Sequence, residues 1–334
     1  MEKAEDWVSS HCSTIRQRAR VAEDKYAKSG KILADIIFDI VLSKKFRKYS
    51  VSEEYKKEIR AAIELNLSRQ LPIQFAFPYG GYKLWRLAES PEPDWAELFS
   101  LAYFAEWLVP IASFYAPGVW FDFSSSDINV EYANNIPRAD LDLYAHEFER
   151  LIEFIAPNIP SNFTFSFTRV RSRYDENEFQ KELNQKMVEL SRTYKNELPE
   201  LTEKEKKAIE LNVKIEPGQN KDSSWMERNK LMYDAYHALS KVRPYYRAPG
   251  KIVVSASSGR ASVPVGTVKT SIVKFQVGVG ALEQRGDNFM PRILSPEQLA
   301  NKRFVWETTV IPGLAGKNFH KIRILNESIA TSLQ

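Results

Sequence analysis

The residues best suited to chemistry follow predicted β-strands at three places in the chain. They are Tyr82, Lys83 and Arg86 after the first strand, Ser125, Ser126 and Asp127 after the second, and Arg260 after a later one. Lysine and arginine can hold a phosphate, a carboxylate can orient an amine or a sugar hydroxyl, and serine can donate to oxygen. We therefore predict Lys83 and Asp127 as catalytic residues and the other five as substrate-binding residues.

The elements that would position these side chains form a strand, helix and strand. The apolar run 73–77 has the length of a strand, and Pro78 begins the loop that ends it. Asp94 and Glu97 form a capping box that begins a helix with one apolar face, and 119–123 alternates as the next strand. Such a unit is right-handed and parallel, and ligands bind beyond the carboxyl ends of its strands.

Three loops are expected to meet at that edge and form the active cleft, namely 78–86, 124–127 and 255–260. Other polar residues have plainer interpretations. Capping already explains Asp94 and Glu97, and the arginines after the predicted strand 163–170 are interpreted as a solvated edge rather than as phosphate ligands. His237 has no nearby histidine or carboxylate at metal-ligand spacing, so a structural or surface role is preferred.

The whole chain predicts one α/β domain over residues 1–334, with a Rossmann-like, mainly parallel sheet. Its expected parts are N-terminal helices over 1–70, a core α/β unit over 71–170, a helical insertion over 175–224 and a C-terminal α/β part over 225–334. Within these parts we expect a short strand and turn over 128–137, and strands at 251–255 and 270–279.

Composition excludes several classes of protein. The net charge of +4, from 47 basic and 43 acidic residues, is not gathered into a basic run, which argues against a nucleic-acid-binding protein. Cys12 is the only cysteine, so neither an intramolecular disulfide nor a cysteine-based zinc site is expected. No apolar run reaches the roughly 18 residues of a membrane span, and the charged N-terminus is unlike a secretory signal. A cytoplasmic protein without a cofactor is expected, and a homodimer is compatible with the sequence.

The commonest catalytic templates are absent from the sequence. It contains no GxxxxGK[ST] phosphate loop, no GxGxxG before a helix, no HExxH and no GxSxG. Only four histidines exist, so a histidine-centred mechanism has few candidates.

The order of several short motifs resembles that of the isocyanide (isonitrile) synthases of pyoverdine and dityrosine biosynthesis. In this chain the order is Pro72-Ile73, Phe77-Pro78, Lys83, Pro93-Asp94, Glu97, Tyr115, Pro117-Gly118 and Ser126-Asp127. The resemblance covers most of the chain. It implies a biosynthetic transferase or lyase that joins the amine of tyrosine or tryptophan to the ketone of ribulose 5-phosphate, whose carbon becomes the isocyanide carbon.

The chain also departs from that family's pattern. Tyr79-Gly80-Gly81 stands where the family has a lysine and a serine, Ser255-Ala256-Ser257 replaces S-I-H, and no P-W-H element occurs near Ser271. Two alternatives therefore stay open. The first is a diverged small-molecule-binding or other biosynthetic protein on the same scaffold. The second is a nucleic-acid-associated protein that stacks bases on Tyr82 and Trp85.

Overall fold

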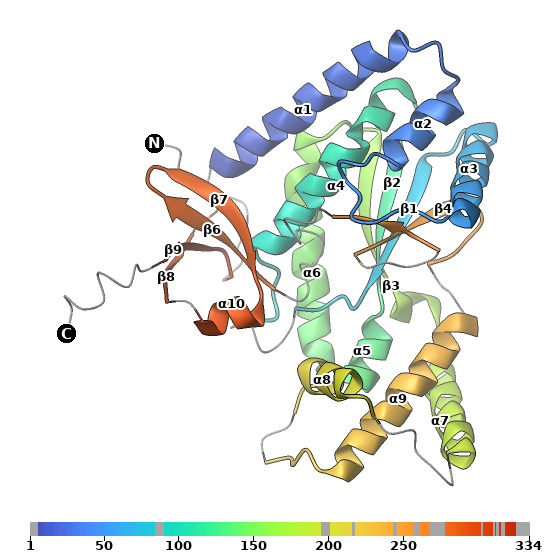
Figure 1. Cartoon of the computed structure of the whole chain (residues 1–334), viewed down its shortest axis with the longest axis vertical. Coiled ribbons are helices and arrows are strands. Elements are labelled where there is room, and N and C mark those ends of the chain that lie inside the picture. The colour runs from blue at the N-terminus through green and yellow to red at the C-terminus, as the bar shows by residue number, and fades with distance from the viewer. Residues whose placement is uncertain are drawn as a thin grey trace.

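The computed structural model is built around a five-stranded parallel sheet (Figure 1). The structure describes the chain except residues 1–5, 84–89, 195–200, 216–217, 243–245, 257–260, 267–277, 302, 310, 312–313, 315–317 and 325–334. The strand order is β3-β2-β1-β4-β5, and every pairing is parallel. The strands are β1 (Ile73–Tyr79), β2 (Val119–Ser125), β3 (Phe163–Arg169), β4 (Lys251–Ser255) and β5 (Val263–Pro264). The predicted Rossmann-like α/β fold is therefore confirmed.

One group of helices packs on the parallel sheet or on the helices that cover it, and a second group lies beyond the carboxyl edge of the sheet (Figure 1). The first group comprises α1 (Asp6–Ala27), α2 (Leu33–Val41), α3 (Glu53–Ser68), α4 (Trp95–Phe114) and α6 (Arg138–Ile155). The second comprises α5 (Asp127–Asn134), α7 (Glu176–Thr193), α8 (Glu203–Asn212) and α9 (Ser223–Val242). Single 3₁₀ turns, Ala156–Asn158 and Val170–Arg173, flank β3. Among the described residues, no helix has both the length and the apolar character that crossing a membrane requires.

Helix α4 lies at the centre of the hydrophobic core and is buried on almost every side. Phe104 packs against Phe121 of β2 with ring centroids 4.5 Å apart, and α1, α2 and α6 contact other faces of the helix. The sequence predicted a single apolar face, which is wrong because α4 is enclosed by the sheet, by three helices and by two strands of a second sheet.

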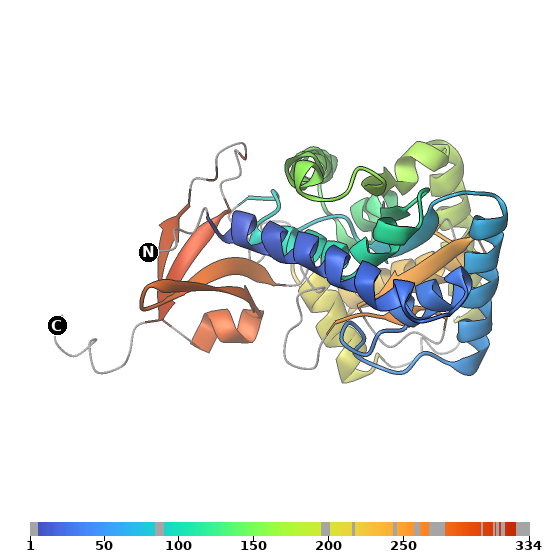
Figure 2. The same cartoon turned by 90° about the horizontal axis from the view of Figure 1, so that it is seen from above.

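The second sheet lies at one end of the molecule. Figure 2 shows that α1 begins beside this sheet and extends across the part of the molecule that contains the parallel sheet. Its order is β7-β6-β9-β8, with β6 and β9 parallel and the other pairs antiparallel. Its elements are β6 (Val279–Arg285), β7 (Asn288–Leu294), α10 (Pro296–Asn301), β8 (Phe304–Thr308) and β9 (His320–Ile324). The predicted turn at Gly286 joins β6 to β7, where φ is +60°.

The prediction for segment 128–137 is also wrong, and that for segment 270–279 falls mostly outside the described residues. Segment 128–137 was expected to be a short strand and turn, but α5 occupies most of it. The Ser126 carbonyl accepts the N–H groups of Asn129 and Val130, which starts the helix. The Val130 side chain then packs in a small buried cluster with Tyr82, so tertiary packing overrides the strand propensity of its β-branched residues. The predicted strand 270–279 lies almost wholly outside the described residues.

Candidate functional site

Lys83 lies in a buried ion cluster at the start of α4. Its Nζ is 2.9 Å from Asp94 Oδ2 and 3.0 Å from Glu97 Oε2, and all three side chains are at most 1% exposed. The Asp94 carboxylate also accepts the Ala96 N–H at 2.7 Å, and Glu97 accepts the Asp94 N–H at 2.9 Å, which confirms the predicted capping box. The charge of Lys83 is therefore compensated within the protein, and the lysine ties its loop to α4.

Two further contacts make this cluster a junction of four elements. The Gly280 N–H of β6 donates to Asp94 Oδ2 at 3.0 Å, and the Tyr144 hydroxyl of α6 donates to Glu97 Oε1 at 3.2 Å. Gly280 has no space for a side chain, because a Cβ there would lie 2.0 Å from the Ala96 nitrogen. The second sheet is thus held, through Gly280 of β6, directly against the first turn of α4.

Burial raises the pKa of Glu97 to about 8, against the opposing charge of Lys83 and with the support of the Asp94 charge. The pKa of Lys83 is also raised, because the two carboxylates outweigh the effect of burial. Below about pH 8 the cluster therefore contains the Lys83 ammonium and a protonated Glu97 that shares a hydrogen bond with Asp94.

We expect this proton to make stability depend on pH. The folded-state pKa of Glu97 lies above its ordinary value of 4.5, so the unfolded chain releases a proton that the folded protein holds. The resulting stabilisation is complete below pH 4.5 and is lost as pH rises toward about 8, at up to about 1.4 kcal/mol per pH unit. Urea denaturation at successive pH values should show this loss in wild type and not in Glu97→Gln. Glu106→Gln, on the same helix, is the control and should follow wild type; parallel curves for all three proteins would contradict the prediction.

Asp127 is also held by cations. The Arg169 side chain donates to Asp127 Oδ2 at 2.7 Å, and the backbone N–H of Arg171 donates to Oδ1 at 3.1 Å. Arg171 extends this network by pairing with Glu131 and Glu176. These arginines therefore join β3 to α5 and α7, and the expectation of a solvated edge is wrong for both.

A cavity of about 390 Å³ lies where the loop after β1, helix α5 and helix α9 meet. It is at the carboxyl ends of β1 and β2, where the sequence placed the cleft. The polar side chains that line it include Tyr82, Ser126, Asn129, Asn134, Tyr233, Tyr236 and His237.

Hydrogen bonds hold the tyrosines of this cavity in place. The Asn134 amide donates to the Tyr82 hydroxyl at 3.0 Å, and the Tyr233 hydroxyl donates to Asn134 Oδ1 at 2.9 Å. Tyr236 forms a hydrogen bond with the Ser126 side chain. Burial raises the pKa of Tyr82 to about 12 and raises that of Tyr233 further, so these hydroxyls stay protonated at neutral pH. The wall can donate hydrogen bonds but does not supply a phenolate.

The structure brings together only some of the residues singled out in the sequence. Tyr82 and Ser126 line the cavity, whereas Lys83 and Asp127 are next to these two in sequence but form ion pairs instead. The Ser125 hydroxyl donates to the Gly80 carbonyl at 3.4 Å. Arg86, Arg260 and most of the 255–260 loop lie outside the described residues.

Sequence reasoning missed the contribution of α9. Tyr233, Tyr236 and His237 stand three and four residues apart and so share one side of the helix. This aromatic spacing was the signal that could have identified the helix as part of the site. Within the described part of the chain, no group of three or more histidine, cysteine, aspartate or glutamate residues is placed to hold a metal ion.

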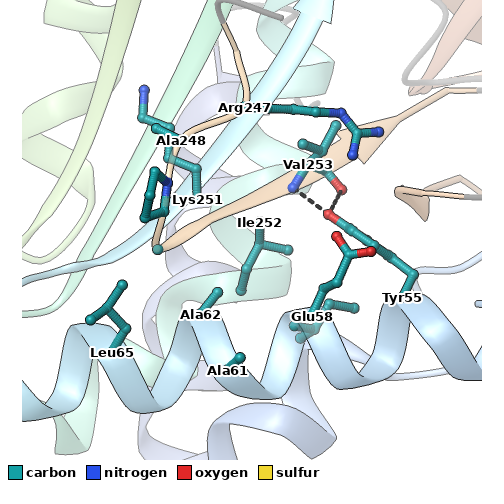
Figure 3. Close-up of a pocket in the computed structure, with 13 residues that line it drawn as sticks. Tyr55, Glu58, Ala61, Ala62, Leu65, Arg247, Ala248, Lys251, Ile252 and Val253 are labelled. Atoms are coloured by element: carbon teal, nitrogen blue, oxygen red, sulfur yellow. Dashed lines mark hydrogen bonds between the residues drawn. The ribbon is translucent and has the colours of Figure 1, made fainter.

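A second hollow, of about 500 Å³, lies between α3 and the start of β4 (Figure 3). Figure 3 shows Tyr55 reaching from α3 to β4, where its hydroxyl accepts the Val253 N–H at 2.7 Å. Glu58 and Arg247 at its rim are exposed. The buried polar group of this hollow is already engaged, so the cavity beside α5 is the stronger candidate site.

No protein-family model matches the chain, and no curated protein matches it. The crystal structure of the PvcA protein from Pseudomonas aeruginosa is similar, with a TM-score of 0.59 and 16% sequence identity. The match covers 88% of this chain and 100% of that one. The chain therefore shares the fold of PvcA over most of its length.

Proposed function

We propose that the chain binds a small organic substrate in the cavity between β1, α5 and α9, and acts on it as an isocyanide-synthase-like enzyme. The observation that carries this proposal is a pocket lined by fixed tyrosine and asparagine side chains at the carboxyl edge of the parallel sheet. The motif order from Pro72 to Asp127 and the PvcA-like fold support the choice of scaffold.

In this proposal the amine of an amino acid attacks the ketone of a sugar phosphate. Protonated tyrosine hydroxyls would donate to the sugar oxygens, and His237 would accept a proton from the amine, because a histidine titrates near neutral pH. Arg86 and Arg260 are the phosphate ligands that the sequence predicts. Lys83 and Asp127 act by holding the loop and α5 that form the pocket.

One observation favours a second candidate, a diverged ligand or reaction on the same scaffold. Both residues predicted as catalytic are committed to ion pairs within the protein. Tyr82, in contrast, gives no support to nucleic-acid binding, because it is 8% exposed and its hydroxyl bonds to Asn134.

Incubation of the purified protein with tyrosine or tryptophan and ribulose 5-phosphate, followed by mass spectrometry, tests the first candidate. We expect an isocyanide product, and we expect His237→Asn to lower its rate about 100-fold, the smaller end of the usual effect of a general base. His146→Asn changes a 68% exposed side chain and should leave the rate unchanged. A folded protein that forms no product would favour the second candidate.

A further inference from the structure

Asn129 has a buried side chain on the wall of the cavity that is not satisfied by the described part of the protein. The residue is 6% exposed, and its Oδ1 atom has no hydrogen-bond partner among the described residues. Its backbone N–H is used at the start of α5, where it donates to the Ser126 carbonyl at 2.9 Å. Buried polar atoms are rarely left unpaired, because the lost hydration is not recovered.

Asn134 provides an internal comparison. It is on the same helix, lines the same cavity and is similarly buried at 8% exposure. Both polar atoms of its amide are engaged, the nitrogen with Tyr82 and the oxygen with Tyr233. The described residues thus satisfy one asparagine of the cavity wall and supply no partner for the acceptor of the other.

We propose that Asn129 recognises the substrate: its side chain rotates so that Oδ1, which is not itself exposed to the cavity, accepts a hydrogen bond from a ligand N–H or O–H group. The surrounding wall suits a ligand whose donor group is attached to a flat apolar body. Val130 and Ala133 supply apolar surface, and the tyrosines supply ring faces. This assignment rests on the proposed location of the site, and it does not depend on which reaction follows.

The first test compares stability without any ligand. Asn129→Leu is nearly isosteric and removes an unpaired acceptor, so its melting temperature should equal or exceed that of wild type. Asn134→Leu removes two hydrogen bonds and should lower the melting temperature by several degrees. If Asn129→Leu were as destabilised as Asn134→Leu, Asn129 would have a structural role and the assignment would be overturned.

The second test measures binding by ligand-observed NMR with three probes. 2-Phenylethylamine and 2-phenylethanol carry a donor, and the N,N,N-trimethylammonium analogue of the amine carries none. We expect a donor probe to bind wild type at least tenfold more tightly than Asn129→Leu, and Asn129→Asp, which keeps an acceptor, to retain binding of the amine. The trimethylammonium analogue should not distinguish wild type from Asn129→Leu.

The outcomes separate this inference from the proposed function. A donor probe that binds wild type and Asn129→Leu equally, and is displaced by tyrosine or tryptophan, would overturn the role of Asn129 and leave the pocket as the substrate site. If no donor probe bound wild type at millimolar concentration, the role of Asn129 would be overturned as well. Isocyanide formation in the separate activity assay would then still support the proposed enzyme.

Discussion

Replacing Lys83 with methionine should destabilise the protein by about 3–5 kcal/mol, the usual loss when one partner of a buried ion pair is removed. Methionine keeps the apolar bulk of the side chain but leaves the Asp94 carboxylate buried without its cation. The measurement is urea denaturation of both proteins at pH 7. Lys45→Met is the matched control, because Lys45 pairs with Glu106 while 59% exposed, and such a pair contributes about 0–1 kcal/mol.

The pH dependence of this loss identifies its cause. The Lys83 charge lowers the pKa of Glu97, so the difference between wild type and Lys83→Met should widen as pH rises past about 8. A Lys83→Met protein as stable as wild type at pH 7 would mean that Lys83 is not needed to neutralise the cluster. The catalytic role predicted from the sequence would then regain support.

Replacing Asp127 with alanine should destabilise the protein by about 2–4 kcal/mol, somewhat below the range for fully buried pairs. Asp127 is 2% exposed, but Arg169 and Arg171 are 23% and 16% exposed and would recover part of their hydration. Asp142→Ala is the control, since Asp142 pairs with the same Arg169 while 51% exposed and should contribute about 1 kcal/mol or less. Chemical denaturation measures both changes.

Binding of the donor probes to folded Asp127→Ala separates two roles for this carboxylate. A structural role predicts a large loss of stability, with binding reduced only as far as α5 shifts. Unchanged stability together with abolished binding would instead support the catalytic role that the sequence suggested for Asp127.

Local signals in the sequence were sufficient where neighbours along the chain determine the structure. The Asp94 and Glu97 capping box is a contact over three residues, and it appears as predicted. The third member of the same cluster was not predictable in this way. Lys83 was treated as a loop cation available to a ligand, because its burial depends on tertiary packing around its partner Asp94. That packing includes the Gly280 N–H, far along the chain, which donates to Asp94.

The candidate site, too, could be predicted from local sequence signals only in part. Its location followed from the parallel strands, and Tyr82 and Ser126 were identified, but Asn129 was assigned to a strand. His237 is exposed, as expected, but its position beside the cavity was not foreseen. The position of His237 beside the cavity depends on the packing of α9 against α5, an arrangement that no local pattern encodes. The acceptor on Asn129 is recognisable only once its lack of a partner is known.

The enclosure of α4 has a consequence for synthesis on the ribosome. Trp95 and the rest of the first turn leave the exit tunnel early, whereas the strand that packs against that turn contains Gly280 and is made near the end. Translation proceeds at about 5–20 residues per second. The first turn of α4 is therefore synthesised on the order of ten seconds before β6, the strand that packs against it. We expect the nascent chain to need chaperone protection during this interval, and chains stalled before β6 to aggregate.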